Sequence, residues 1–340
     1  MNWDPTGGSS SPMAWIDHLT MKRRPDMIDY IDKIKQISKQ ILTDCKVDMV
    51  IGFRQGTVPM MNEPCFAKTV DDVDQFVWDS HCGINLANYL TGRKEKIGIV
   101  AKGCDTRNIV THIIENKIDR DQLYIIGVPC KGMIDRRQVN ALGDSIYEVV
   151  EAGDTVKVTG ANFEKELARA DILQKNCMTC VHPNPVLYDE RVADEVEVKT
   201  DIDRWADVNK IEAMTPDDKW GYFDDLLKEC IRCYACRNAC PLCYCPTCFV
   251  DESRPQWMEK GQDPIDIRTF HFLRAYHCAG RCTDCGACAR ACPVGIDMRV
   301  FTKKLEKDCY DLYGWEAGLT LDVRPPLDTY QADDPEEFIK

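Results

Sequence analysis

The sequence predicts two domains of different kinds, an α/β domain with a partly parallel sheet and, after it, a smaller α+β domain rich in cysteine. The chain has 340 residues, which is about two domains at roughly 150 residues each. Short apolar runs alternate with helical patterns between residues 44 and 188, and such alternation is typical of a parallel sheet. Twelve of the 20 cysteines lie between Cys230 and Cys292.

The elements of the first domain follow from its apolar spacing. Isoleucines at helical intervals predict a helix over 26–43. Apolar runs predict strands at 47–53, 96–101 and 123–128, and a one-sided apolar stripe predicts a helix over 106–117. Strand, helix and strand in this order predict a parallel pair joined by a right-handed crossover. Residues 70–90 have a mostly helical pattern, which Gly83 interrupts.

Shifts in composition predict the domain boundaries. We expect an N-terminal arm and helix at 1–43, the α/β domain at 44–188, an acidic linker at 189–219, the cysteine-rich domain at 220–312 and an acidic tail at 313–340.

Composition and charge exclude several classes of function. Hydrophobic residues make up 44% of the chain and charged residues 29%, with a mean hydropathy of −0.36, which fits a globular protein with a core. The net charge of −13 argues against nucleic acid, whose binding depends on cationic side chains. The sequence predicts neither a transmembrane helix nor a secretory signal. We therefore expect a cytoplasmic protein, whose clustered cysteines are metal ligands rather than disulfides.

Two stretches of the second domain share the spacing C-x2-C-x2-C-x3-C-P. Their members are Cys230, Cys233, Cys236, Cys240 and Pro241 in the first stretch, and Cys282, Cys285, Cys288, Cys292 and Pro293 in the second. This run is typical of bacterial ferredoxins, in which three cysteines bind one 4Fe–4S cluster and the fourth binds the other. We therefore expect a ferredoxin-like dicluster domain. The fourth cysteine is expected to open the next helix, with the proline in its first turn.

Crossed ligation assigns each cluster to one triplet and one distant cysteine. The first cluster takes Cys230, Cys233, Cys236 and Cys292, and the second takes Cys282, Cys285, Cys288 and Cys240. Zinc is the alternative, but a zinc site would use paired C-x2-C hooks rather than two triplets that each precede C-P.

Four further cysteines lie between the two runs, namely Cys243, Cys245, Cys248 and Cys278. They are candidates for an extra cluster or a zinc ion, and the alternative is that they are small buried apolar side chains. His271 and His277 flank this region, and we expect them to be structural.

The first domain carries a third candidate set. Cys104 and Cys130 each follow a predicted strand, and parallel strands bring such residues to one carboxyl edge, where ligands bind. Cys177 and Cys180 add a C-x2-C hook. We expect these four to hold a third 4Fe–4S cluster, and we expect the remaining cysteines to be structural: Cys45, Cys65, Cys82 and Cys309.

The motifs around these cysteines resemble those of a known family. Lys-Gly-Cys104-Asp-x-Arg, then Ile-Gly-Val-Pro-Cys130-x-Gly, then Cys177-x2-Cys180 are similar to the β subunits of coenzyme F-420-reducing hydrogenases and formate dehydrogenases, here with a dicluster domain appended. The resemblance covers about residues 44–185. It implies that the cysteines hold a cluster and pass electrons near a flavin.

The chain departs from this family where FAD is expected to bind. The family has a glycine-rich turn that opens a helix near its start, but Gly7 and Gly8 lie in a serine-rich stretch without a following strand and helix. An alternative phosphate cradle is the turn at Lys102 and Gly103 with Arg107, at the start of a predicted helix. FAD therefore stays an open expectation.

The leading hypothesis is an iron–sulfur electron-transfer subunit of an anaerobic oxidoreductase, such as a formate dehydrogenase, hydrogenase or heterodisulfide-reductase-type complex. No pair of residues is spaced for nucleophilic catalysis, so the chemistry is expected on a partner chain that carries flavin, molybdenum or nickel. The alternative is a flavin-containing subunit that itself oxidises or reduces coenzyme F-420 or NAD(P)H, and a remote one is a zinc-organised regulatory module. At least one of two segments, residues 1–25 or the tail after Asp322, is expected to pack on a catalytic or flavin-bearing neighbour in a stable hetero-oligomer.

Overall fold

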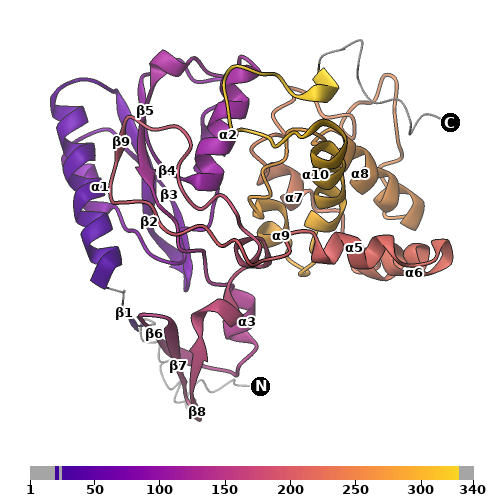
Figure 1. Ribbon diagram of the computed structural model, residues 1–340, viewed down its shortest axis with the longest axis horizontal. Helices are drawn as coiled ribbons and strands as arrows, with labels where there is room; N and C mark the ends of the chain where they lie inside the picture. Colours follow the sequence, from indigo (N-terminus) through magenta and orange to yellow (C-terminus); the bar gives the residue numbers. More distant parts are fainter. Residues whose placement is uncertain (1–19, 23–24, 329–340) are drawn as a thin grey trace, which may run out of the picture. The chain divides into compact units, whose positions relative to one another are not determined.

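The structure is a computed structural model that describes residues 20–22 and 25–328 (Figure 1). Most of the predicted N-terminal arm and the last part of the predicted tail lie outside these residues. Contacts divide the described chain into two compact units. The smaller comprises 20–22 and 135–172, and the larger comprises 25–134 and 173–328. Each is described by itself.

A five-stranded sheet organises the N-terminal part of the larger unit, in the order β3-β2-β4-β5-β9. The strands are β2 (Met49–Val58), β3 (Met61–Ala67), β4 (Ile97–Lys102), β5 (Leu123–Val128) and β9 (Glu190–Arg191). β3 is antiparallel to β2, and the other pairings are parallel. The parallel pair β4 and β5, joined through helix α2 (Gly103–Ile114), confirms the predicted strand–helix–strand unit.

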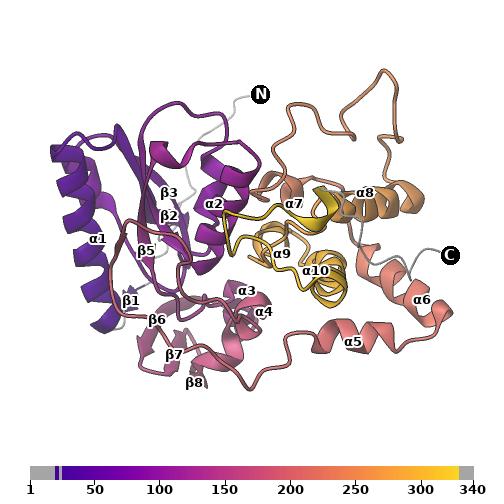
Figure 2. The same cartoon turned by 45° about the horizontal axis from the view of Figure 1, so that its top comes forward.

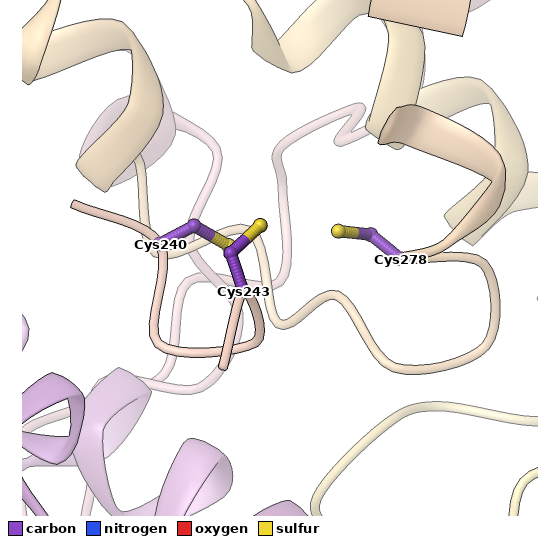
Figure 3. Close-up of side chains that lie close together, drawn as sticks. All are labelled: Cys240, Cys243 and Cys278. Carbon is purple, nitrogen blue, oxygen red and sulfur yellow. The ribbon is translucent and has the colours of Figure 1, made fainter. Parts of the chain in front are cut away.

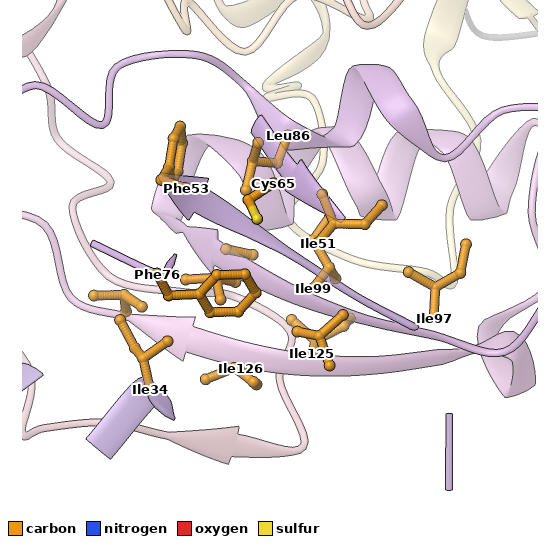
Figure 4. Close-up of a cluster of buried hydrophobic side chains, with 14 of the residues drawn as sticks. Ile34, Ile51, Phe53, Cys65, Phe76, Leu86, Ile97, Ile99, Ile125 and Ile126 are labelled. Carbon is orange, nitrogen blue, oxygen red and sulfur yellow. The ribbon is translucent and has the colours of Figure 1, made fainter. Parts of the chain in front are cut away.

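Two helices cover the faces of this sheet. Helix α1 (Pro25–Thr43) lies on one face and α2 on the other (Figures 1 and 2). Ile34, Ile37 and Ile41 of α1 are each 1% exposed, so the predicted stripe faces the core. Figure 4 shows Ile34 beside strand residues of this core, including Ile125 and Ile126. The packed sheet holds the ends of β4 and β5 in fixed positions.

The prediction of a mostly helical stretch over 70–90 is wrong. Only two short 3-10 helices form there, Asp71–Gln75 and Leu86–Tyr89. Between them the Asp79 carboxylate accepts hydrogen bonds from Asn62 Nδ2 at 2.7 Å and from the His81 backbone N–H at 2.8 Å. Bonds from a carboxylate to nearby backbone compete with a helix, and here they accompany an irregular chain path that buries Trp78.

The rest of the larger unit is helical. It comprises α4 (Lys175–Met178), α5 (Ala206–Glu212), α6 (Pro216–Leu227), α7 (Ala235–Asn238), α8 (Pro264–Tyr276), α9 (Ala287–Ala291) and α10 (Arg299–Tyr313). Thr215 and Asp263 cap α6 and α8, each of which begins with proline, a residue suited to the first helical position. Apolar side chains such as Phe270 and Met298 form a second core between these helices.

This helical region carries no strand within described residues 192–328, which differs from the α+β expectation. Its cysteine runs instead fold into tight turns that contain left-handed residues, and such residues interrupt extended backbone.

Three further short 3-10 helices form at Arg120–Gln122, Arg169–Ile172 and Pro326–Asp328. No helix in the described part of the chain combines the length and the apolar character needed to span a bilayer.

The smaller unit is a four-stranded sheet in the order β1-β6-β7-β8, with helix α3 (Arg136–Asn140). Its strands are β1 (Thr20–Lys22), β6 (Ile146–Ala152), β7 (Thr155–Gly160) and β8 (Phe163–Ala168). β1 is parallel to β6, and the other pairs are antiparallel. The apolar spacing predicts no strands in this stretch, although β6 and β7 flank the two-residue turn Gly153-Asp154, which is a recognised hairpin signal.

Candidate metal centre

The two cysteine runs fold into the same local structure. In each triplet the residue just before the second cysteine and the residue just after it have positive φ: Arg232 (50°) and Tyr234 (59°) in the first, Asp284 (51°) and Gly286 (71°) in the second. A short helix follows each turn, α7 after the first and α9 after the second. Repeated left-handed residues curl the backbone, so the three thiols of each triplet line one side of a tight turn.

The predicted place of the fourth cysteine in its helix is wrong. Cys240 comes after α7 has ended, and Cys292 is the C-cap of α9 with extended backbone (φ −68°, ψ 118°). Pro241 and Pro293 therefore follow a helix end rather than open a helix. The physical reason is that a proline disfavours helical backbone in the residue before it, so the helix stops at the fourth cysteine.

Two cavities gather the thiols across the two runs. One is lined by Cys230, Cys233 and Cys236 together with Cys292 of the other run. The second is lined by Cys282, Cys285 and Cys288 together with Cys240. These are the two crossed sets that the spacing predicts. Cys278 also lines the second cavity.

Burial controls the ionisation of these thiols. It raises the pKa of Cys236 to about 12 and that of Cys285 to about 12. Thiols in this environment stay protonated at neutral pH unless a metal binds, because metal ligation needs the thiolate. Buried thiols that stay neutral fit an iron–sulfur site, which supplies the positive charge that deprotonates them.

Arg274 of α8 brings a positive charge to both cavities. Its side chain is 4% exposed and lines the second cavity, and its Nη2 atom donates to the Cys236 carbonyl oxygen at 3.0 Å. Its Nε atom is buried without a hydrogen-bond partner among the described residues. An unpartnered buried donor is costly. It therefore fits a site in which cluster sulfur accepts the bond.

His271, which was expected to be structural, borders the first cavity. Its Nε2 atom lies 3.3 Å from Cys230 Sγ. Burial lowers its pKa to about 3, with the charges of Arg274 and Arg232 adding to the effect. The ring is therefore neutral at pH 7, and a neutral ring with its proton on Nε2 donates to the cysteine sulfur.

A buried ionic group lies against the second cysteine run. The Asp284 carboxylate accepts from Arg299 at 2.7 and 3.0 Å and from Lys303 at 2.9 Å. Burial opposes ionisation of Asp284, but these two cations hold its pKa to about 2. Burial and the charge of Asp284 raise the pKa of Glu306 to about 7. Asp284 is thereby fixed as an anion that orients the turn.

The third predicted set gathers at the carboxyl edge of the sheet. Cys104 is the second residue of α2, Cys130 follows β5, and Cys177 lies in α4. Burial raises the pKa of Cys130 to about 12, and the charge of Cys177 adds to the effect. Burial raises the pKa of Cys180 to about 11, again with a contribution from Cys177. Two adjacent backbone N–H groups donate to Cys130 Sγ and to Cys177 Sγ, each at 3.4 Å, which places these two thiols beside the same turn.

The third set also neighbours the second cavity, which the sequence analysis did not anticipate. Burial raises the pKa of Cys104, and the charges of both Cys285 and Cys130 contribute to the rise. Asn108 connects the two regions, because its Nδ2 atom donates to the Cys104 carbonyl oxygen at 3.0 Å and to Thr283 Oγ1 at 2.8 Å. The order along the molecule is therefore first cavity, second cavity, third set.

The four insert cysteines do not converge as a group. Cys245 is exposed, and neither it nor Cys248 joins a cluster of ligand atoms in the described chain. Instead Cys243 and Cys278 meet Cys240, with all three sulfur atoms within 4.8 Å of one another (Figure 3). Hydrogen bonds from Cys240 and Cys278 lower the pKa of Cys243 to about 3.

The residues considered for flavin phosphate have partners inside the protein. Lys102 is 2% exposed and its Nζ atom bonds Asp105 at 2.8 Å. Arg107 is 4% exposed and its Nε atom donates to the Ala317 carbonyl oxygen at 2.9 Å. A Cβ added at Gly103 would lie 2.3 Å from the His182 carbonyl oxygen. These contacts give all three residues structural roles at the start of α2, while Arg107 Nη2 is buried without a hydrogen-bond partner among the described residues.

Comparisons with known proteins agree with this geometry. Residues 226–296 match the family model of the 4Fe-4S dicluster domain. Over 362 aligned residues the chain is 24% identical to the β subunit of F420-dependent formate dehydrogenase from Methanocaldococcus jannaschii, covering 86% of this chain and 93% of that protein. It is also 24% identical to the F420-dependent formate dehydrogenase 1 β subunit from Methanococcus maripaludis, covering 86% and 92%.

One solved structure is also similar, the F420-reducing NiFe hydrogenase complex from Methanosarcina barkeri, at 13% identity and a TM-score of 0.36 over 62% of this chain and 92% of that one. A TM-score this low carries no argument about fold or function. The curated relatives and the domain match confirm the resemblance that the sequence predicts: the chain is similar to the β subunits of F420-dependent formate dehydrogenases, and its residues 226–296 match a 4Fe–4S dicluster domain.

Proposed function

We propose that this chain is an iron–sulfur electron-transfer subunit of a multi-subunit oxidoreductase of the formate dehydrogenase or hydrogenase type. The observation that carries the proposal is the pair of cavities, each lined by three cysteines of one run and one of the other, within the region that matches a dicluster domain. The names of the relatives support the assignment to formate dehydrogenase.

In this proposal the first 4Fe–4S cluster is held by Cys230, Cys233, Cys236 and Cys292, and the second by Cys282, Cys285, Cys288 and Cys240. A third is held by Cys104, Cys130, Cys177 and Cys180, which gives about twelve irons per chain. Bound clusters supply one-electron redox chemistry. The third assignment rests on the position of its thiols at one edge of the sheet. It is supported by the effect of the Cys177 charge on the pKa of Cys130 and of Cys180.

The chain's own residues hold, shield and tune these sites. The apolar cores on either side pack against several of the thiols, among them Cys130, Cys177 and Cys236. His271 Nε2 faces the Cys230 sulfur, and Arg274 brings a positive charge beside the cavities. Such hydrogen bonds and charges set cluster potentials. Asn108 fixes the third set against the second run. The third site is thereby kept next to the second one in space.

Electrons must enter and leave such a chain through partners. We infer a hetero-oligomer whose other subunits carry flavin, molybdenum or nickel, in a reducing, cytoplasmic compartment that keeps the cysteines as thiols. Among the described residues Lys102 and Gly103 are occupied by internal contacts and Arg107 is buried, so we place flavin chemistry on a partner chain.

The test is anaerobic purification of the native complex, with counts of iron, acid-labile sulfide, zinc and flavin per chain. About twelve irons with matching sulfide support three clusters. A count of about eight irons per chain would show that the third set of cysteines holds no cluster. Zinc without acid-labile sulfide would overturn the proposal. Flavin bound to this chain after its partners have been removed would support the alternative, a subunit that itself handles coenzyme F-420 or NAD(P)H.

A further inference from the structure

Three cysteine sulfur atoms form a contact cluster at the edge of the second cavity. Cys240, Cys243 and Cys278 lie within 4.8 Å of one another (Figure 3). Cys243 is held in the turn after α7, where its N–H donates to the Cys240 carbonyl oxygen at 3.1 Å. Cys278 is held just past α8, where its N–H donates to the Ala275 carbonyl oxygen at 2.9 Å. Two rigid turns therefore bring the sulfur atoms together.

Two of these three thiols have no role in the cluster sets. Cys240 is the fourth ligand of the second cluster in the proposed function, on which this inference rests. Cys243 and Cys278 are left over. Cys278 is 2% exposed and also lines the second cavity, so a thiol without a ligand role faces the same space as Cys282, Cys285 and Cys288.

A mononuclear metal site fits this cluster poorly. A structural zinc ion takes four protein ligands, and only three residues converge here in the described chain. One of the three is needed by the second cluster. The Arg274 guanidinium, which has no carboxylate partner in the described part of the chain, acts on Cys240 and Cys278. This positive charge offsets negative charge on these sulfur atoms without a metal ion.

We propose that Cys243 and Cys278 form a reversible dithiol–disulfide couple beside the second cluster. Closing the bond brings two sulfur atoms from under 4.8 Å to the S–S length of about 2.05 Å. On reduction the S–S bond breaks, two electrons arrive from the clusters one at a time, and two protons arrive from solvent to give two thiols. On oxidation the same two electrons return to the clusters and the two protons leave.

The surroundings give this couple access to protons. A surface hollow is lined by Tyr244, which follows Cys243, and by His277 and Ala279, which flank Cys278. Cys278 thus lines the second cavity, while residues next to both cysteines in the chain line a hollow that is open to solvent. This position lets a buried pair gain or lose protons while it stays next to the cluster.

The couple is tested on the full, iron-loaded chain without oxygen. The protein is equilibrated in mixtures of oxidised and reduced dithiothreitol, alkylated, digested and analysed by mass spectrometry. We expect a linked peptide pair that joins Cys243 to Cys278 in oxidising mixtures and disappears in reducing ones, with iron content unchanged. Dithionite titration of the oxidised form should consume two electrons per chain more than the Cys243→Ser variant does.

Cys245→Ser is the matched control, because Cys245 lies two residues from Cys243 but is exposed and outside the sulfur cluster. It should form the linked pair and consume electrons as the unmodified chain does. The couple is overturned if no mixture yields the pair while iron is full, if the electron counts are equal, or if Cys243→Ser releases a bound zinc ion. A native chain without iron or sulfide that still forms the pair would support the couple but sink the proposed function.

Discussion

Arg274 Nη2 donates a hydrogen bond to the Cys236 carbonyl oxygen at 3.0 Å, and so fixes a buried guanidinium where it contacts the first cysteine run and lines the second cavity. A positive charge stabilises the reduced, more negative state of a nearby cluster. Two unit charges about 8 Å apart at an effective dielectric constant of about 20 interact by about 2 kcal/mol. For a one-electron couple this is on the order of 90 mV.

We therefore predict that Arg274→Gln lowers the potentials of the two dicluster sites by tens of millivolts. The measurement is a redox titration followed by electron paramagnetic resonance, with iron content as the check on cluster loss. Arg268→Gln is the control, because Arg268 lies on the same helix and pairs with Asp224 near the surface. Unchanged potentials in an Arg274→Gln chain with full iron would show that this charge does not act on the clusters.

The crossed lining of the cavities gives a second prediction. Cys240→Ser should remove the second cluster and spare the first, although Cys240 belongs to the first run, because its sulfur lies at the cavity of Cys282, Cys285 and Cys288. Iron should fall by about four per chain. Spectroscopy should retain the signal of the first cluster. Selective loss of the cluster held by Cys230, Cys233 and Cys236 would contradict the crossed assignment.

A third prediction concerns stability at mildly acidic pH. His112 of α2 is fully buried and its Nε2 atom lies 2.7 Å from the Pro241 carbonyl oxygen, to which it donates. Burial lowers the pKa of His112 in the folded chain. Below the ordinary histidine pKa of about 6.5, His112 binds a proton in the unfolded chain but stays neutral in the folded chain. The stabilising contribution is thus complete above that pH and is lost as pH falls toward the lowered pKa.

His112→Gln keeps a donor for Pro241 but cannot titrate. The variant and the unmodified chain should have similar thermal midpoints at pH 7.5, and the variant should lose less stability between pH 6.5 and 5. The measurement is anaerobic thermal unfolding across this pH range. Parallel pH profiles for the two chains would show that His112 does not carry the acid sensitivity.

Local spacing made much of the site predictable. The C-x2-C-x2-C-x3-C-P runs determine which thiols share a turn, and the apolar runs 96–101 and 123–128 placed Cys104 and Cys130 at the same sheet edge. Both signals are local, because they depend on backbone geometry within a few residues or on the pairing of adjacent strands.

The rest depends on tertiary packing that no local pattern records. Cys278 meets Cys243 only because α8 packs through Phe270 into the second core. Cys104 lies near Cys285 only because Asn108 joins α2 to the second run. The strands of the smaller unit were missed although their hairpin signal is local, because the stretch was interpreted as part of one α/β domain.

The last prediction concerns the segment after α10. This segment contacts the start of α2, the helix that carries Cys104. Gly318 has φ +73°, and a Cβ there would lie 2.1 Å from the Arg107 carbonyl oxygen, while Arg107 Nε donates to the neighbouring Ala317 carbonyl oxygen at 2.9 Å. Gly314 has φ +60°, but no heavy atom lies within 4 Å of its added Cβ. Both glycines therefore have the left-handed backbone that favours glycine. Only at Gly318 would an added side chain also clash with nearby backbone.

Gly314→Ala should cost about 1 kcal/mol or slightly more, the price of left-handed backbone in an L-residue. Gly318→Ala should cost clearly more, because the clash is with backbone of a buried helix and cannot be relieved by turning a side chain. Anaerobic thermal unfolding should rank the midpoints as unmodified, Gly314→Ala, then Gly318→Ala. Iron release to a chelator should be fastest in Gly318→Ala, because the displaced helix carries Cys104. Equal midpoints for the two variants would show that the 315–319 segment moves freely against α2.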